Sequence, residues 1–293
     1  MSARRIAGVL APVTTPFDAA GEVAAEDFRR NVERHLADGL HGVVVAGSTG
    51  EAPLLELDEV RRLVAAARRA IPADRWLVVG TGAEATRQAI ALSRAAATEG
   101  ADLVLVRPPG YYSAAYTPQS LTAYFRAVAD ASPVPVLVYN IPKFTHVTLA
   151  ASVIERLVDH PRIVGAKDSS GDVKSLAAYR EIAPRWSILA GSCSLLEAAL
   201  GLGCDGGVVG VACYAAPRCA ELYRAFCAGD RERAHALQLQ LTPLDKEIVA
   251  RLGPAGIKAA MDLVGLVGGP VRPPLGPLAE ADRRRVAELV GRD

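Results

Sequence analysis

A lysine at the end of an apolar run is the first residue of this sequence that suggests chemistry. The segment IVGAKDSSGD, residues 163–172, begins like a buried β-strand, because small and β-branched residues pack well in a sheet covered on both faces. An ammonium without a partner is costly to bury, so buried lysines are rare unless they have a function. Lys167 is also one of only five lysines beside 28 arginines, which suggests an amine chosen for its chemistry. A dry cavity favours the neutral amine, which attacks carbonyl groups. The plain alternative is a lysine that reaches solvent or pairs with Asp168.

Two further segments carry groups that would assist such an amine. Tyr139 ends the apolar run PVLVYNIP, and a phenol there can move a proton between a substrate oxygen and solvent. In GSTGE, residues 47–51, two glycines flank two hydroxyl residues, so backbone N–H groups can turn toward a carboxylate or a phosphate. No lysine follows the second glycine, which excludes a P-loop. The alternatives are a core tyrosine with a hydrogen-bonded hydroxyl and an ordinary turn between a strand and a helix.

Other patterns that could bind cofactors or metals fail on their spacing. Residues 80–85, GTGAEA, match the dinucleotide pattern GxGxxA, but the next apolar run, ADLVLV, carries its carboxylate, Asp102, at the wrong end to bind a ribose. The five cysteines lack CxxC spacing and are expected to be buried small apolar residues. The five histidines are scattered without HExxH. We therefore expect no nucleotide cofactor, no disulfide framework and no metal site.

The chemically interesting residues fall at the ends of apolar runs that alternate with helical patterns eight times. The runs are IAGVLAPV, GVVVAG, WLVVGTG, ADLVLVRP, PVLVYNIP, IVGAKDS, SILAGS and GGVVGVA. Strands that alternate with helices need parallel crossovers, and parallel strands covered on both faces read as continuous apolar runs. Eight units predict an α/β fold of the (β/α)8 TIM barrel type, with a doubly wound open sheet as the alternative.

The barrel prediction fixes where the site should lie and how the chain is divided. Active sites of such barrels lie at the carboxyl ends of the strands, and alternation would turn Gly165, Lys167 and Ser169 toward the interior. We expect the barrel to occupy residues 1–228 and a C-terminal helical extension packed on it to occupy residues 229–293.

Composition narrows the partners. The net charge of +1 gives no electrostatic argument for nucleic acid or an anionic membrane. No apolar run approaches the roughly 20 residues of a membrane span, and the opening segment MSARRIAGVL lacks the apolar core of a secretion signal. A cytoplasmic protein acting on a small molecule is expected.

The order and spacing of GSTGE, YNIP and VGAKDSSGD resemble the dihydrodipicolinate synthase and N-acetylneuraminate lyase superfamily of class I aldolases, from APVTTPF near the start to GGPVRPPL near the end. The resemblance implies that Lys167 forms a Schiff base with a 2-keto acid and that Tyr139 transfers protons. Ser48 and Thr49 would bind the carboxylate of pyruvate and relay protons to Tyr139. The remaining expected site residues are Ser169, which alternation puts beside Lys167, and Gly191 and Val209, whose backbones would line the pyruvate pocket.

The resemblance also implies a quaternary structure and a chemistry without cofactors. Tyr111, with Tyr112 as the alternative, would reach the site of a neighbouring subunit in a homotetramer built as a dimer of dimers. No metal and no organic cofactor is implied.

Substrate choice depends on the residues around YNIP. Synthases of this superfamily carry an arginine two residues after that proline, which grips the carboxylate of the aldehyde substrate, and here Phe144 stands in its place, so the bidentate contact is lost. The segments HPRIVGAKDSSGDV and LGPAGIKAAMDLVGLVGGPVRPPL are most similar to 4-hydroxy-2-oxoglutarate aldolases, which release pyruvate and glyoxylate. Thr49 and Asn140 are closer to 2-keto-3-deoxy-sugar-acid aldolases and sialic acid lyases. The prediction is cleavage of 4-hydroxy-2-oxoglutarate; the alternatives are a sugar-acid aldolase or dehydratase, dihydrodipicolinate synthase, and a carboxylate-binding barrel without turnover.

Overall fold

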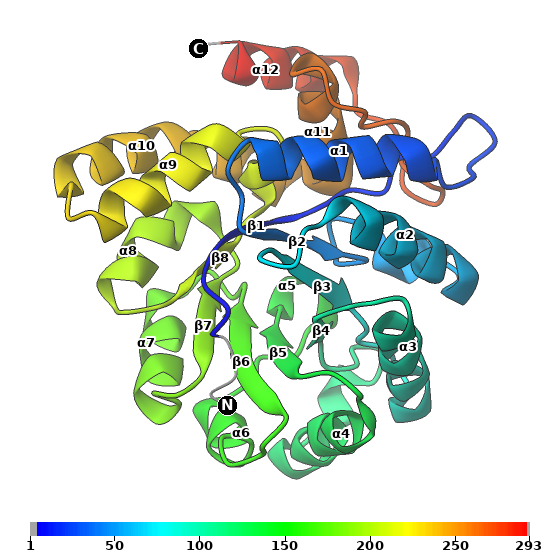
Figure 1. The fold of residues 1–293 in the computed structure, drawn as a ribbon, viewed down its shortest axis with the longest axis vertical. Helices are drawn as coiled ribbons and strands as arrows, with labels where there is room; N and C mark the ends of the chain where they lie inside the picture. Colours follow the sequence, from blue (N-terminus) through cyan, green and yellow to red (C-terminus); the bar gives the residue numbers. More distant parts are fainter. Residues whose placement is uncertain (1–4, 292–293) are drawn as a thin grey trace.

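Eight parallel strands close into a barrel in the computed structural model, which describes residues 5–291 (Figure 1). Each strand pairs with the next one in the chain, and β8 pairs with β1. The strands are β1 (Gly8–Pro12), β2 (Gly42–Val45), β3 (Trp76–Gly80), β4 (Leu103–Val106), β5 (Val136–Asn140), β6 (Ile163–Asp168), β7 (Ser187–Ala190) and β8 (Gly206–Val208). The closed order confirms the TIM barrel and contradicts the open sheet.

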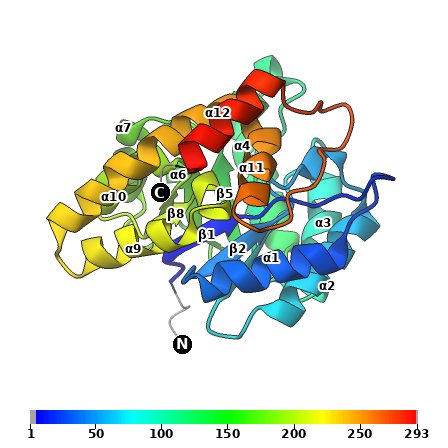
Figure 2. The same ribbon diagram turned by 90° about the horizontal axis from the view of Figure 1, so that it is seen from above.

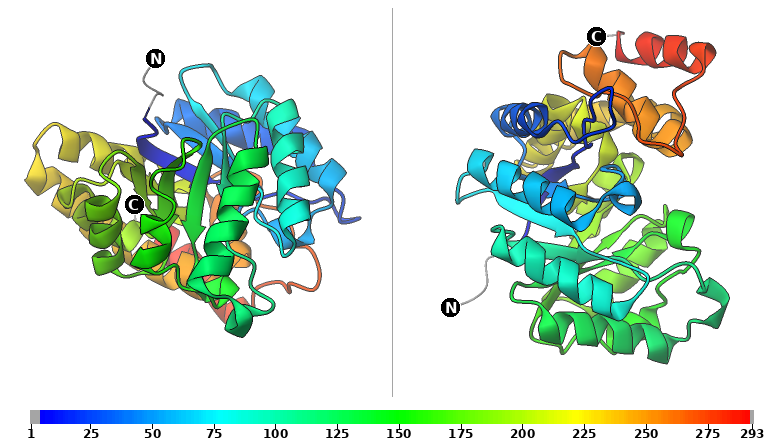
Figure 3. Two further views of the ribbon diagram at one scale, coloured as in Figure 1. Left: turned by 90° about the horizontal axis from the view of Figure 1, so that it is seen from below. Right: turned by 90° about the vertical axis from the view of Figure 1, so that its right-hand side faces the viewer.

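Helices that follow the strands cover the outside of the barrel (Figures 1 and 3). They are α1 (Ala25–Ala37), α2 (Leu57–Ala70), α3 (Thr86–Thr98), α4 (Pro118–Ala131), α6 (Ala151–Glu155), α7 (Val173–Ile182), α8 (Leu196–Gly201) and α9 (Ala216–Cys227). The short helix α5 (Pro142–Thr145) instead follows β5 directly at the carboxyl end of the strands. Short 3-10 turns lie at Ala52–Leu54, Ser113–Ala115, Cys193–Leu195 and Gly210–Cys213. Local signals start several helices: Thr117 and Ser120 form a capping box before α4, whose first residue is Pro118.

The continuous apolar strands pack in two directions. Leu137 and Tyr139 of β5 belong to an apolar cluster inside the barrel, whereas Val136 and Val138 pack against the outer helices. The same alternation runs through β6, where Ala166 packs outward and its neighbour Lys167 pairs with Tyr139. Lys167 therefore faces the interior, as its spacing predicts.

The chain continues beyond α9 into a helical extension. Helix α10 (Arg231–Leu244) lies beside α9, passes through a π-helical turn (Asp245–Ala250) into α11 (Arg251–Leu263), and a further segment leads to α12 (Glu280–Val290) (Figure 2). The helix bends at Gly253, whose φ of 60° and ψ of −146° are accessible mainly to glycine, and at Pro254, which has no N–H to donate. The extension is as expected, whereas its division from the barrel as a domain at residues 228 and 229 stays a prediction.

Two remaining expectations concern the ends and the cysteines. Residues 1–4 of the opening segment MSARRIAGVL and residues 292–293 of the extension lie outside the described residues. Within residues 5–291, no helix is long and apolar enough to cross a membrane. Four of the five cysteines, Cys193, Cys204, Cys213 and Cys219, are buried free thiols, as expected. Cys227 at the end of α9 is exposed, which corrects the expectation for that residue.

Candidate active site

Lys167 and Tyr139 lie side by side at the carboxyl ends of β6 and β5. The two residues are register partners, and the Lys167 amine donates a hydrogen bond of 3.1 Å to the Tyr139 hydroxyl. The amine also lies 4.2 Å from the centre of the tyrosine ring. Each residue is only 5% exposed. The neighbouring strands therefore place an amine and a phenol in direct contact inside the barrel mouth.

Asp168 does not neutralise Lys167. Its carboxylate accepts hydrogen bonds from the Asn140 amide (3.3 Å), from the Ser170 N–H (2.6 Å) and from the Ser175 hydroxyl. Among residues 5–291, no acidic side chain forms an ion pair with Lys167. Both alternatives for Lys167, a lysine reaching solvent and a lysine paired with Asp168, are therefore wrong.

A cavity of about 270 Å³, here called the lysine cavity, opens at the barrel mouth. Ser48, Thr49, Tyr139, Lys167, Ser169 and Gly191, all expected at the site, line this cavity. The wall opposite the strands comes from the extension, through Asp245, Val249, Ala250, Gly253, Pro254 and Ile257. The extension thus closes the cavity that the barrel opens.

The loop after β2 is held in an unusual backbone conformation. Ala46 and Glu51, on either side of GSTG, both have left-handed φ values, of 51° and 58°, which cost non-glycine residues energy. The Thr15 hydroxyl donates to the Gly50 carbonyl at 2.7 Å. Ser48 and Thr49 are half-buried at the cavity wall. The loop is therefore fixed by its surroundings and does not rely on local preference.

Glu51 anchors this loop to the extension through a buried ion pair. Its Oε1 lies 2.6 Å from the Lys258 amine, and its Oε2 accepts the Arg272 N–H at 2.9 Å. The Lys258 amine also donates to the Pro270 carbonyl at 2.6 Å. Burial lowers the pKa of Lys258, although Glu51 opposes this effect. No local pattern in the sequence predicts this pair, which joins residues about 200 positions apart.

The hydroxyl relay from Thr49 to Tyr139 is not formed in this structure. The Tyr139 hydroxyl interacts with Lys167 and, at a long 3.5 Å, accepts from the Ser169 hydroxyl. Among the described residues, no hydrogen bond connects Thr49 with Tyr139. The relay through Thr49 stays a prediction, and Ser169 is the hydroxyl residue that contacts the phenol.

The two residues whose backbones were predicted to line the pocket, Gly191 and Val209, differ in their relation to the lysine cavity. Gly191 lines the lysine cavity, and a Cβ there would come within 1.9 Å of the Ser169 hydroxyl oxygen, so this position requires glycine. Val209 is fully buried, with its N–H bonded to the Leu10 carbonyl, while its neighbours Val208 and Gly210 line the cavity.

Tyr111 and Tyr112 belong to an exposed loop after β4. They are 81% and 67% exposed, and their rings meet edge to face. Tyr111 lines a second cavity of about 680 Å³, here called the tyrosine cavity, which also reaches Ser48 and Tyr139. Among residues 5–291, no hydrogen bond joins the Tyr111 side chain to Lys167 or Tyr139. Within the described part of one chain, Tyr111 is therefore not hydrogen-bonded to the expected catalytic residues.

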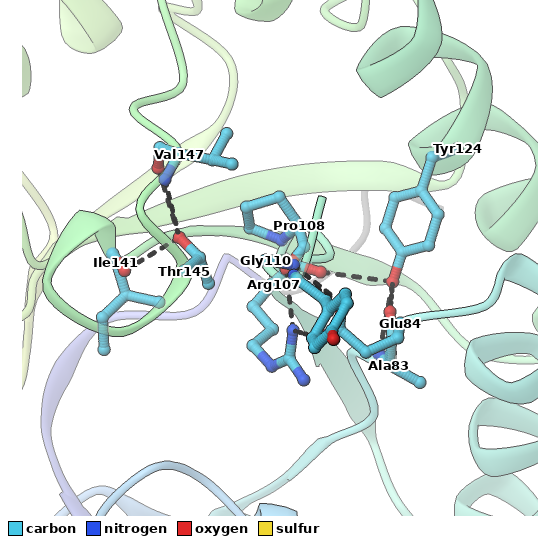
Figure 4. A network of polar contacts seen from close by, with 10 residues as sticks. Ala83, Glu84, Arg107, Pro108, Gly110, Tyr124, Ile141, Thr145 and Val147 are labelled. Atoms are coloured by element: carbon cyan, nitrogen blue, oxygen red, sulfur yellow. Dashed lines mark hydrogen bonds and ion pairs between the residues drawn. The ribbon is translucent and has the colours of Figure 1, made fainter. Parts of the chain in front are cut away.

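Glu84 fixes the base of this loop (Figure 4). Its carboxylate accepts the N–H groups of Gly110 and Tyr111, each at 2.9 Å, and pairs with Arg107 at 3.0 Å. Burial alone would raise the pKa of Glu84, but the two N–H donors and Arg107 together lower it. The aromatic loop is therefore presented by an anchored backbone.

Asp245, Lys143 and Pro254 are among the residues of the lysine cavity that sequence reasoning did not predict. Asp245 accepts from the Ser192 hydroxyl and from the N–H and hydroxyl of Ser194, and so holds the loop after β7. Lys143 and Pro254 line the same cavity. The scarcity of lysines could have identified Lys143, and a proline within a helical pattern could have indicated a break near Pro254, but neither was predicted.

Comparison with known proteins gives a match along the whole chain. A model of the dihydrodipicolinate synthetase family matches residues 5–292. A 4-hydroxy-tetrahydrodipicolinate synthase of Synechococcus sp. (strain CC9605) is 37% identical over 287 residues, which cover 96% of this chain and 93% of that protein. A DapA-like lyase of Halobacterium salinarum is 38% identical over 278 residues, which cover 94% of this chain and 90% of that protein.

Solved structures agree with this match. Dihydrodipicolinate synthase DapA-2 of Bacillus anthracis has a TM-score of 0.94 and 27% identity, with 99% of both chains covered. The chloride-inhibited dihydrodipicolinate synthase of Acinetobacter baumannii, solved in complex with pyruvate, has a TM-score of 0.92 and 30% identity, with 98% of this chain and 99% of that chain covered.

Proposed function

This chain belongs to the dihydrodipicolinate synthetase family, as a class I, metal-independent lyase, and on this premise we propose that Lys167 forms a Schiff base with a 2-keto acid. The observation that carries the proposal is the buried Lys167 amine, which lies 3.1 Å from the Tyr139 hydroxyl and has no acidic partner among the described residues. An amine in this setting is a nucleophile for a carbonyl, and the adjacent phenol is a proton carrier.

The chemistry proceeds through an imine. The Lys167 amine adds to the 2-keto group, and Tyr139 passes protons so that the oxygen leaves as water. Tyr139 then takes the proton of the 4-hydroxyl, the C3–C4 bond breaks, and its electron pair moves into the enamine while the aldehyde leaves. Protonation at C3 and hydrolysis release pyruvate and restore the amine. Synthesis runs the same carbon–carbon step in reverse.

Ser48 and Thr49 bind the carboxylate of the keto acid in this proposal. Both lie on the wall of the lysine cavity, in the loop that Glu51 anchors. Gly191 lets Ser169 keep its place at the cavity wall, because a Cβ at Gly191 would come within 1.9 Å of the Ser169 hydroxyl oxygen. Small groups around the cavity thus orient the keto acid toward Lys167.

Two reactions, which differ in the aldehyde, are candidates for this site. Cleavage of 4-hydroxy-2-oxoglutarate to pyruvate and glyoxylate is favoured by Phe144, which lines the lysine cavity where synthases carry an arginine. Condensation of pyruvate with aspartate semialdehyde is favoured by the relatives, because the Synechococcus protein carries the synthase name. The relatives support the synthase at least as strongly as the residues support the aldolase.

A homotetramer built as a dimer of dimers is part of the proposal. The exposed pair Tyr111 and Tyr112 gives an apolar surface beside the tyrosine cavity, which a second copy would cover. In such an assembly the Tyr111 hydroxyl would approach the site of the neighbouring subunit.

Trapping with borohydride tests the covalent step. Reduction in the presence of pyruvate should add the mass of a reduced pyruvyl group to the peptide that contains Lys167. Lys167→Ala should remove the adduct, and Lys174→Ala, at an exposed lysine of α7, should keep it. A wild-type protein without an adduct would end the proposal.

Rates with both substrate pairs decide between the two activities. We expect pyruvate release from 4-hydroxy-2-oxoglutarate to exceed condensation of pyruvate with aspartate semialdehyde, as judged by kcat/KM. The reverse order would assign the synthase activity. Release of water without an aldehyde from a sugar acid, followed by NMR, would indicate a dehydratase.

A further inference from the structure

The lysine cavity contains a second amine besides Lys167. Lys143, in the short helix α5 that follows β5, lines the cavity together with its neighbour Phe144. Its amine donates a 2.5 Å hydrogen bond to the Ala250 carbonyl in the extension. The side chain thus connects the end of a barrel strand to the opposite wall of the cavity.

The break in the extension creates the acceptor that holds Lys143. In an α-helix the Ala250 carbonyl would accept the N–H of the residue four positions on, but that residue is Pro254, which has none. The backbone also turns away at Gly253. The carbonyl is therefore available, and the Lys143 amine occupies it at the cavity wall.

Among the described residues, the basic and acidic side chains around the cavity are two amines and one carboxylate, and neither amine is paired with that carboxylate. Asp245 is the carboxylate among the lining residues, and its Oδ2 already accepts from Ser192 and twice from Ser194, at 2.6 to 2.9 Å. Within residues 5–291, no acidic side chain forms an ion pair with Lys143. One carbonyl satisfies only one of the three donors of an ammonium. Lys143 is exposed at the edge of the cavity, and its amine also lies 5.4 Å from the centre of the Phe144 ring. It therefore offers a positive charge and two further N–H donors to a molecule bound there.

We propose that Lys143 binds a carboxylate on the aldehyde half of the substrate. This inference rests on the proposed function, in which Lys167 becomes the imine and Ser48 and Thr49 bind the carboxylate of the keto acid. The substrate class is then a 4-hydroxy-2-keto dicarboxylate, or pyruvate with an aldehyde that carries an acid group. A sugar acid with a neutral hydroxylated tail gains no ion pair from Lys143.

Lys143 acts as a point charge, with consequences for selectivity. An ammonium lacks the planar fork by which arginine grips a carboxylate with two parallel hydrogen bonds. Phe144 gives no charge at the next position and is 53% exposed. The cavity therefore selects for the presence of an anionic group more than for its orientation.

Two aldehydes of equal carbon number test the inference. Glyoxylate carries a carboxylate where glycolaldehyde carries a hydroxymethyl group, and the addition of pyruvate to each is measured with Lys143→Met, Lys143→Arg and the control Lys246→Met. Lys246 is exposed, and it is not among the residues lining the cavity. In Lys143→Met, kcat/KM for glyoxylate should fall about 10- to 100-fold, mainly through KM, as expected for the loss of a hydrogen bond to a charged group. The glycolaldehyde value should change less than about threefold, and Lys143→Arg should recover part of the glyoxylate rate.

The outcomes separate this inference from the proposed function. Lys143→Met should still trap pyruvate alone with borohydride, and in calorimetry it should weaken binding of 2-oxoglutarate more than binding of pyruvate. An equal loss with glyoxylate and glycolaldehyde, with normal trapping, would overturn the role of Lys143 and leave the Schiff-base mechanism intact. A wild-type protein that traps no pyruvate would overturn the proposed function and this inference with it.

Discussion

At the scale of single residues, the site depends on two side chains that are in direct contact with each other. Lys167 and Tyr139 are register partners on adjacent strands, so their contact is set by the main chain. Asp168, the nearest acid in the sequence, is fully engaged by Asn140, Ser170 and Ser175. Within residues 5–291 the amine therefore contacts a phenol and no neutralising carboxylate, which suits covalent capture of a ketone followed by proton transfer.

Replacement of Tyr139 should separate these two roles. In Tyr139→Phe, loss of the phenol should lower kcat for cleavage by about 10² to 10⁴, the usual contribution of a positioned proton carrier. The reduced pyruvate adduct on Lys167 should still form after long incubation, because the nucleophile remains. Steady-state rates and mass spectrometry measure both effects. An unchanged kcat would show that another group moves the proton.

At the scale of elements, the structure ties the loop after β2 to the extension. The Glu51 and Lys258 side chains are 0% and 2% exposed, and Lys258 also lies 4.6 Å from the centre of the Phe17 ring. A buried ion pair of this kind contributes little net stability compared with apolar groups of similar size, but loss of one partner leaves an isolated buried charge. The pair joins the end of the loop after β2, where Glu51 has a left-handed φ of 58°, to the extension.

Substitutions at this ion pair should be strongly non-additive. Lys258→Met should lower the free energy of unfolding by about 3 to 5 kcal/mol, because Glu51 is left charged and buried. The double variant Glu51→Gln with Lys258→Met should recover much of that loss. Urea unfolding of both single variants and the double variant measures the coupling. Additive losses would show that the two side chains act independently.

The elements also show which parts of the site could be predicted from sequence. Lys167, Tyr139, Ser48 and Ser169 follow from strand ends and alternation, which are local properties of the chain. Lys143 and Asp245 could not be predicted as site residues. Their partners, Ala250 and the loop after β7, come from segments about 50 to 100 residues away, and periodicity carries no information about such contacts. The relay from Thr49 to Tyr139 stays a prediction; the loop that carries Thr49 is tied by Glu51 to Lys258, a contact that local sequence patterns do not indicate.

At the scale of the whole molecule, the barrel and the extension share one site. The strands supply the reacting groups, and residues 245–257 supply the opposite wall of the lysine cavity. α1 lies next to α2 and near the extension on the same side of the molecule (Figures 1 and 2). We therefore expect that protonation of a buried group in α1 lowers the stability of the folded chain.

The buried His35 of α1 should make the protein less stable in mild acid. His35 is fully buried, neither ring nitrogen has a hydrogen-bond partner among the described residues, and burial, assisted by Arg34, lowers its pKa from 6.5 to about 4. Since the folded pKa lies below the unfolded one, the unfolded state binds the extra proton between these values, and stability is full above pH 6.5 and lost as the pH falls toward 4. At about 1.4 kcal/mol per pH unit, His35 accounts for about 3 kcal/mol of this loss. Urea unfolding measures the free energy of unfolding at pH 7 and at pH 4. The loss of free energy between these pH values should be smaller by that amount in His35→Leu than in the wild type. The control His235→Gln, a change at an exposed histidine, should behave like the wild type. Parallel curves for all three proteins would show that His35 does not titrate in this range.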